Sequence, residues 1–279
     1  MAAALSPLAE EVRRHDRDRF VTALFAPADR REALFALYAF NSEIARIRES
    51  VSEPLLGEMR LQWWRDALEM IYAGGDRAHP VFRGLAAAIH AHKLTRAPFD
   101  RLIDARAADL VNGPPDTLAT LEAYAAGTAS TLIESALEVL GARSEAAKQA
   151  AYHAGIGWAL TGLLRAVPFH ASAGRIFLPK ELLSAEGVDD EAVSEGKPLP
   201  GLARVAETVG AVAVRHLSMA RDMRHRIPRQ ARTTLLTTAL AETYLRRLAR
   251  AGYNLFDHTW SETRPAVARL AIRAALGRY

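Results

Sequence analysis

Hydrophobic residues recur along the chain at helical spacing, and no segment shows the sustained alternation of apolar and polar positions that is typical of strands. Short breakers separate the helical segments, and the sequence contains no internal repeat or low-complexity tract. Long antiparallel helices with short connections are typical of a helical bundle, so the pattern predicts an all-α fold of about eight to ten helices around a central space.

Prolines, glycines and capping residues set the expected helix boundaries. After Pro27, Asp29 is the expected N-cap of a helix that reaches about Val51, and the next helix begins at Pro54 and ends at Gly74. Further helices are expected over residues 79–93, 98–111, 117–140, 145–168, 200–226, 228–251 and 263–276.

Proline also predicts where one long helix stops. Pro168 lacks a backbone amide hydrogen, so the helix over residues 145–168 is expected to kink or end there. The segment from Phe169 to Pro200 contains several glycines and prolines and is expected to be irregular, with short turns.

The length and composition of the chain predict that the helices share a single large hydrophobic core. The chain has 279 residues, of which 50% are hydrophobic, and alanine, leucine, arginine and glutamate are abundant helix formers. We therefore expect one domain over residues 1–279. The apolar stretches are shorter than the roughly 20 residues of a membrane-spanning helix, and residues 1–10 lack the basic start of a secretory signal.

Charge and cysteine content exclude several classes of function. The net charge of +4 arises from 36 basic and 32 acidic side chains, too small an excess to predict a nucleic-acid partner. An acidic partner or an anionic membrane surface remains compatible with it. The absence of cysteine excludes disulfides, thiolate metal sites and thiol nucleophiles, and it agrees with a cytoplasmic location.

Several blocks resemble the squalene/phytoene synthase family in their order and spacing. They are RFVTALFAP at residues 19–27, RLQWWRDAL at 60–68, the acidic positions Asp104 and Asp109, the segment from Tyr124 to Thr128, and Leu164-Arg165 followed by GRIFLP at 174–179. The resemblance extends over about residues 17–180. It implies the isoprenoid-synthase fold, an all-α helical bundle around a central cavity.

The catalytic members of that family use two aspartate-rich helices to bind magnesium ions, which neutralise the departing diphosphate. In this sequence the first such element aligns with residues 45–49, Ala-Arg-Ile-Arg-Glu, where only Glu49 is acidic. The three acidic positions of the second element align with Ala166, Phe169 and His170. The chain is therefore expected to hold no cofactor, and only a prenyltransferase would require Mg²⁺.

Within this family the sequence is similar to a subgroup with degenerate aspartate motifs, the mitochondrial assembly factors of respiratory complex I and their bacterial relatives. The similar blocks lie at residues 39–45, 50–53, 59–64 and 164–170. The resemblance implies a non-catalytic protein whose partner is a complex I subunit or assembly intermediate. Such a protein would contact the inner membrane peripherally, on the matrix side in a eukaryote. The alternative is a head-to-head prenyltransferase acting on farnesyl or geranylgeranyl diphosphate.

Basic residues near the degenerate motifs are the main candidates for ligand binding. If the fold is as expected, Arg46, Arg48, Arg165, Arg175 and Lys180 lie near the diphosphate end of the cavity, where guanidinium groups could bind a phosphate or an anionic lipid headgroup directly. The alternative is that the first two of these arginines form a structural network with nearby carboxylates. The carboxylates considered are Glu43, Glu49 and Asp104.

No residue is predicted to be catalytic or to bind a metal. His170, a lone histidine beside Pro168, is expected to be a hydrogen-bonded structural group, and no second histidine lies at zinc-ligand spacing. Trp63 and Trp64 are expected in the core and the cavity wall. The candidate residues for binding an isoprenoid, a diphosphate or a lipid are Arg46, Arg48, Glu49, Arg60, Asp104, Asp109, Arg165, His170 and Arg175.

Overall fold

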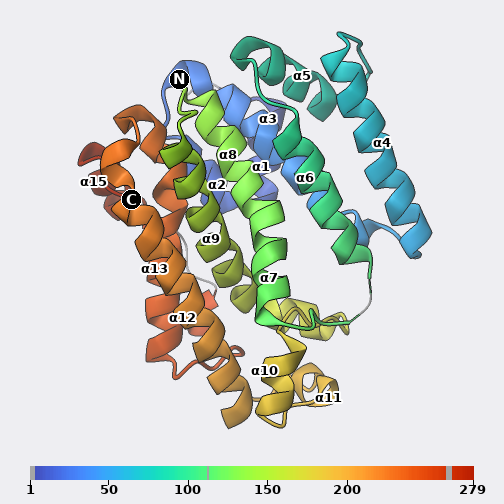
Figure 1. Cartoon of the computed structure of the whole chain (residues 1–279), viewed down its shortest axis with the longest axis vertical. Coiled ribbons are helices and arrows are strands. Elements are labelled where there is room, and N and C mark those ends of the chain that lie inside the picture. Colours follow the sequence, from blue (N-terminus) through green and yellow to red (C-terminus); the bar gives the residue numbers. More distant parts are fainter. Residues whose placement is uncertain (1–3, 112, 262–265) are drawn as a thin grey trace.

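The computed structural model describes residues 4–111, 113–261 and 266–279, and every regular element in these ranges is helical. Long helices lie side by side in the body of the molecule (Figure 1), which confirms the predicted all-α class. The longer helices are α3 (Ala28–Ala45), α4 (Pro54–Tyr72), α5 (Pro80–His92), α6 (Ala97–Arg106), α9 (Glu145–Ser172), α12 (Pro200–Asp222) and α13 (Leu236–Arg250).

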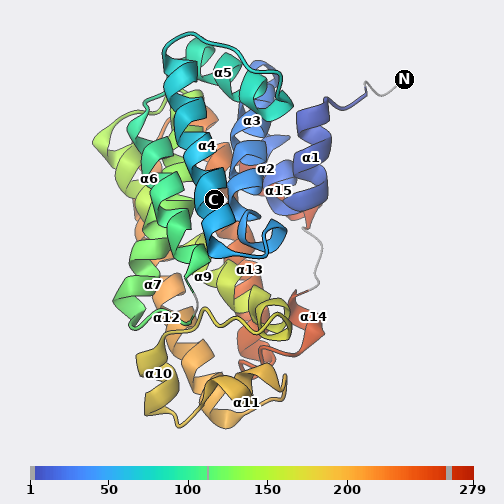
Figure 2. The same cartoon turned by 90° about the vertical axis from the view of Figure 1, so that its right-hand side faces the viewer.

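Shorter helices complete the bundle. Figure 2 shows α10 and α11 together at one end of the molecule and α5 across the opposite end. The shorter helices are α1 (Pro7–His15), α2 (Arg17–Ala23), α7 (Leu118–Ala125), α8 (Thr131–Val139), α10 (Lys180–Ala185), α11 (Asp190–Ser194), α14 (His258–Ser261) and α15 (Val267–Ala275). None of the described helices is both long and hydrophobic enough to cross a bilayer.

Helix α9 lies at the centre of the bundle, where it packs against α7, α8, α12 and α13. Small residues allow these helices to approach closely. A Cβ atom on Gly155 would lie 2.3 Å from backbone atoms of Ser130, and one on Gly157 would lie 2.6 Å from the side chain of Leu217 on α12. Close packing therefore requires glycine at position 155, whereas a side chain at position 157 would force the Leu217 side chain to move.

Aromatic side chains join α3, α4 and α6. The Phe40 ring packs edge-on against Trp64 at 4.9 Å and against Phe99 at 5.8 Å between ring centroids. All three side chains belong to the buried core. This packing fixes the spacing of α3 and α4, which carry the first degenerate motif and the tryptophan pair.

The start of α3 differs from the prediction. Pro27 occupies the N-cap position without a side-chain hydrogen bond, and Asp29 lies in the first turn, so the expected Asp29 cap is wrong. A carboxylate in the first turn still stabilises the helix through the macrodipole. The helix also ends earlier than expected, at Ala45, and a 3-10 turn over Arg48–Ser50 follows it.

The helix predicted over residues 117–140 is interrupted. Thr117 caps it as expected, its side chain accepting a hydrogen bond from the Thr120 amide at 3.1 Å. A π-helical turn over Ala126–Ser130 separates α7 from α8. The Thr131 hydroxyl donates to the Gly127 carbonyl at 2.6 Å, which satisfies one carbonyl within that turn.

Of the kink or end expected at Pro168, the end is wrong, because α9 continues through this residue to Ser172. The segment over residues 169–200 is more regular than predicted, since it contains the rest of α9 together with α10 and α11. At the C-terminus the expected helix start at Thr263 lies outside the described residues. Helix α15 begins at Val267.

Candidate functional site

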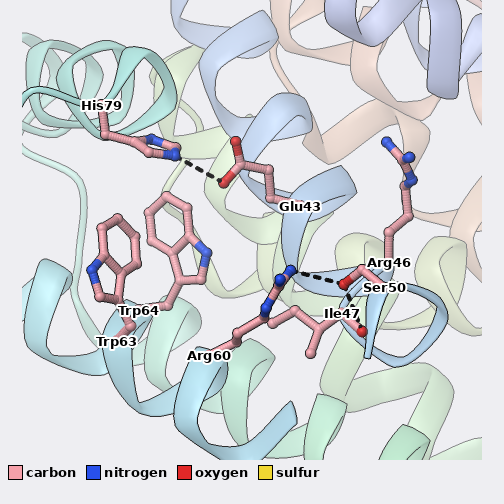
Figure 3. Close-up of a pocket in the computed structure, with 8 residues that line it drawn as sticks. All are labelled: Glu43, Arg46, Ile47, Ser50, Arg60, Trp63, Trp64 and His79. Atoms are coloured by element: carbon pink, nitrogen blue, oxygen red, sulfur yellow. Dashed lines mark hydrogen bonds and ion pairs between the residues drawn. The ribbon is translucent and has the colours of Figure 1, made fainter. Parts of the chain in front are cut away.

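A pocket of about 380 Å³ lies beside the first degenerate motif, where the end of α3 faces α4 and the start of α5 (Figure 3). Its lining contains arginine side chains as well as aromatic ones. We call it the Arg46 pocket, and its lining residues are Glu43, Arg46, Ile47, Ser50, Arg60, Trp63, Trp64 and His79. The predicted place of Trp64 in the core and of both tryptophans in a pocket wall is confirmed.

His79 is held in the Arg46 pocket by its role at the start of α5. It is the N-cap residue, and its Nδ1 accepts a hydrogen bond from the Phe82 amide at 3.3 Å. Because Nδ1 is the acceptor, the proton of the neutral ring lies on Nε2. This Nε2 atom lies 3.7 Å from the Glu43 carboxylate.

Burial changes the acidity of this pair. Desolvation, together with the negative charge of Glu11, raises the pKa of Glu43 to about 7, although Arg46 opposes the change. Burial lowers the pKa of His79 below its usual value. The pocket therefore contains a carboxyl group that titrates near neutral pH beside a histidine that favours its neutral form.

The arginines of the Arg46 pocket have partners that the sequence did not indicate. Arg46 points away from the tryptophans (Figure 3), toward α1, where its Nη1 lies 2.9 Å from His15 Nε2 and 3.8 Å from Glu11 Oε1. Arg60 Nη1 donates to the Ser50 hydroxyl at 2.9 Å. Both guanidinium groups are thus held in place by residues of neighbouring elements.

The proposed network of Arg46 and Arg48 with nearby carboxylates is not formed. Arg48 and Glu49 have no ion pair within the described residues, and Asp104 pairs instead with Arg65 of α4 at 3.0 Å. The Asp104 side chain is 67% exposed, so it is a surface group rather than a cavity residue. This expectation is therefore wrong.

Arg165, in the second degenerate motif, is bound by a carboxylate of the chain itself. Its Nη1 lies 3.0 Å from Asp18 Oδ2 on α2, and the Tyr244 hydroxyl of α13 donates to Asp18 at 3.0 Å. The guanidinium also lies 3.8 Å from the centroid of the Tyr244 ring. Burial raises the pKa of Asp18 in spite of the opposing effect of Arg165.

Asp109 belongs to a separate, buried cluster. Arg106 Nη1 donates to Asp109 Oδ2 at 3.1 Å, and the Tyr124 hydroxyl donates to Asp109 Oδ1 at 2.7 Å. The same Arg106 nitrogen donates to the Tyr124 oxygen at 2.8 Å. This triangle pairs one positive charge with one negative charge and links the end of α6 to α7, although the buried Arg106 Nε has no hydrogen-bond partner among the described residues.

His170 and Arg175 both contact Phe177, with 4.6 Å between the ring centroids of His170 and Phe177 and 4.9 Å from the Arg175 guanidinium to the same ring. Burial, assisted by Arg175, lowers the pKa of His170 to about 4, so the ring is neutral at physiological pH. Its buried Nδ1 has no hydrogen-bond partner among the described residues, contrary to the expected hydrogen-bonded role.

The structure therefore distributes the candidate residues over several places. Arg46 pairs with Glu11, Arg165 pairs with Asp18, and the Arg175 guanidinium lies over the Phe177 ring. The sequence reasoning missed Asp18 and Tyr244 entirely. A usable signal existed for His79, because a histidine directly before Pro80 stands at a helix start.

The family model for squalene/phytoene synthase matches residues 12–271 of this chain. The chain belongs to the squalene/phytoene synthase family. A solved squalene synthase from Alicyclobacillus acidocaldarius has the same fold, with a TM-score of 0.79 at 22% identity, covering 88% of this chain and 93% of that one. The expected isoprenoid-synthase helical fold is confirmed.

Relatives in this family have two kinds of names. The protein named "NADH dehydrogenase (ubiquinone) complex I, assembly factor 6" of Bos taurus is 34% identical over 247 residues, which cover 88% of this chain and 74% of that protein. The phytoene synthase of Rhodobacter capsulatus is 30% identical over 182 residues, which cover 65% of this chain and 54% of the enzyme. The expected similarity to complex I assembly factors is confirmed.

The magnesium ions of the family's enzymes do not fit the residues at the two motifs. Magnesium prefers oxygen ligands, chiefly carboxylates. Glu49 is the only acid of the first element, where Arg46 adds a positive charge, and the second element contributes an alanine, the 56% exposed Phe169 and His170. Within the described ranges, no three His, Cys, Asp or Glu side chains are grouped as a metal site.

Proposed function

We propose that this protein is a non-catalytic member of the squalene/phytoene synthase family that acts in the assembly or stability of respiratory complex I. The observation that carries the proposal is the replacement of both acidic motifs within a retained fold. The relatives named as assembly factors support the functional assignment, since they match 88% of the chain.

The chemistry of prenyl transfer supports the absence of catalysis. Ionisation of an allylic diphosphate needs positive charge at the departing group, which the family's enzymes obtain from magnesium. Here the acids that would hold the metal are replaced, and Arg165 already binds Asp18 at 3.0 Å. A head-to-head prenyltransferase, the alternative suggested by the similarity to phytoene synthase, would lack this charge stabilisation.

The proposed partner is a subunit or an assembly intermediate of complex I, reached from the surface of the inner membrane. The names of its relatives support this partner, because the matching proteins are named as assembly factors of complex I. In a eukaryote the protein would act on the matrix side. No nucleic-acid partner is proposed.

The Arg46 pocket is the proposed site for an anionic isoprenoid or lipid ligand. Trp63 and Trp64 offer an apolar wall, and Arg60 can exchange its bond to Ser50 for a phosphate oxygen. Farnesyl diphosphate should therefore bind in the presence of EDTA, and Arg60→Gln should weaken binding about tenfold. Arg65→Gln, on the same helix outside the pocket, is the control. Absence of farnesyl diphosphate binding by the wild type would contradict this site.

Deletion of the gene in its own organism tests the proposed function. We expect the amount of assembled complex I and its NADH:ubiquinone activity to fall, with squalene, hopanoid and carotenoid levels unchanged. A plasmid copy of the wild-type gene should restore complex I. Loss of an isoprenoid product with normal complex I would contradict the proposal and favour a prenyltransferase.

A further inference from the structure

Helix α15 carries arginines and exposed apolar side chains on one face. Arg269, Ile272, Arg273 and Leu276 are spaced at i, i+3, i+4 and i+7, so they share a face and line the same hollow. Ile272 is 62% exposed and Leu276 is 59% exposed, whereas Leu270 is buried against the body. Large apolar side chains with this exposure, placed between cations, need a physical reason.

The body of the protein holds α15 in this orientation. Arg229 donates to the Ala275 carbonyl and Arg232 Nη1 donates to the Gly277 carbonyl at 3.0 Å, so both arginines cap the C-terminal end of the helix. The buried Tyr279 donates its hydroxyl hydrogen to the Ala220 carbonyl of α12 at 3.0 Å. These contacts with residues 229–232 and with α12 hold α15 in the orientation that exposes its arginines and apolar side chains.

Arg221 of α12 and Arg224 of the 3-10 turn after it reach the same place. A hollow of about 580 Å³ is lined by five arginines and a single acid, Glu242. We define the C-terminal basic face as these arginines with Arg246 and the two exposed apolar residues, namely Arg221, Arg224, Arg246, Arg269, Arg273, Arg278, Ile272 and Leu276.

Glu242 cannot neutralise this face. It pairs with Arg221, with Arg273 at 3.4 Å and with Arg246 at 3.7 Å, so one carboxylate serves three guanidinium groups. Arg269 and Arg278 have no ion pair within the described residues. Burial and the positive charges of its neighbours lower the pKa of Arg246, which agrees with an excess of positive charge.

An apolar hollow continues from the C-terminal basic face. It has a volume of about 510 Å³, shares Arg221 and Glu242 with the arginine-lined hollow, and extends between α12 and α13 along Val214, Leu245 and Tyr253. Positive charge and apolar surface thus follow one another along the same side of the protein. This order matches an anionic headgroup followed by an acyl chain.

We propose that the C-terminal basic face docks on an anionic phospholipid membrane. Its guanidinium groups would bind lipid phosphates, Ile272 and Leu276 would enter the interface, and the neighbouring hollow would accept part of an acyl chain. An acidic protein would satisfy the arginines but would leave the apolar side chains unexplained. The inference extends the proposed function, because complex I is a membrane complex, but it can be tested without complex I.

Sedimentation of the purified protein with vesicles tests the proposal. We expect binding to vesicles of phosphatidylcholine and phosphatidylglycerol mixed about two to one, weak binding to phosphatidylcholine alone, and release by salt. The double variant Arg269→Gln/Arg278→Gln should bind about thirtyfold more weakly, since each arginine near an anionic surface contributes about fivefold in affinity. Arg13→Gln/Lys148→Gln, with the same change in net charge at exposed sites on α1 and α9, should bind like the wild type.

A second variant tests the apolar part of the face. Ile272→Ser/Leu276→Ser should weaken binding about tenfold without changing its dependence on salt, because it removes insertion and leaves the charges. Circular dichroism should show unchanged helix content in all variants. Equal binding of the wild type and the arginine variant, or equal binding to both vesicle types, would overturn the proposal. No binding to either would overturn it in favour of an acidic protein partner, and the gene-deletion result would stand independently.

Discussion

At the scale of single residues, Glu43 shows how the fold changes the chemistry of an ordinary side chain. Its carboxyl group lies within 3.7 Å of His79 and is only 30% exposed. Burial raises its pKa from 4.5 to about 7, so the folded protein retains a proton that the unfolded chain has already released at intermediate pH. Folded stability therefore decreases as the pH rises through this window.

This linkage predicts the effect of Glu43→Gln. The variant cannot lose a proton, so relative to the wild type it should become more stable by about 1 to 2 kcal/mol between about pH 5 and pH 8, after allowance for solvent exposure. Urea denaturation of both proteins at the two pH values measures the difference. Glu49→Gln, an exposed change on the following turn, is the control. A pH-independent difference for Glu43→Gln would contradict the assigned environment.

Asp18 and Arg165 give a second prediction at this scale. Asp18→Ala removes a partly buried carboxylate from Arg165 and from the Tyr244 hydroxyl, so we expect a loss of about 2 to 3 kcal/mol in the free energy of unfolding. Asp29→Ala breaks an exposed pair with Arg30 and should change stability by less than about 0.5 kcal/mol. Equal effects in thermal or urea denaturation would show that the Asp18 pair is not the partly buried contact described.

The partners of individual residues were the least predictable feature of the sequence. Charge and spacing indicated that Arg46 and Asp104 could form ion pairs, yet the partners are Glu11 and Arg65, on helices that only the tertiary fold brings close. Asp18 lies 147 residues from Arg165 in the chain. Local spacing carries no information about contacts of this kind.

At the scale of elements, the contact between α9 and the π-helical turn over Ala126–Ser130 leads to a paired prediction. Gly155→Ala places a Cβ 2.3 Å from the Ser130 backbone and should destabilise the protein by about 2 to 3 kcal/mol. In the same helix, Gly162→Ala meets no atom within 4 Å and should stabilise by about 0.5 to 1 kcal/mol through helix propensity. Thermal unfolding of the two variants measures both changes, and equal signs would contradict the packing.

Helix positions were predictable where the sequence contains a strong local signal. Pro54 begins α4 and Thr117 caps α7, as expected from their known preferences at helix starts. Pro168 was misleading because packing keeps α9 helical beyond it, and the π-helical turn has no local sequence mark. Tertiary contacts decided both features, and these contacts cannot be read from a single segment.

At the scale of the whole molecule, the family fold persists while the acidic side chains of its metal motifs are replaced. Residues of the first element now support the Arg46 pocket, and Arg165 of the second binds Asp18. The blocks of family sequence predicted the fold. They could not predict the C-terminal basic face, because its arginines come from helices outside those blocks.

The central claim is that this family member has kept the fold and lost prenyl transfer. The most direct test is an assay of the purified protein with farnesyl or geranylgeranyl diphosphate and Mg²⁺, with a working squalene synthase as the positive control. We predict no condensation product above that of a blank without protein. Turnover to squalene, phytoene or a related product, abolished by a metal chelator, would contradict the claim.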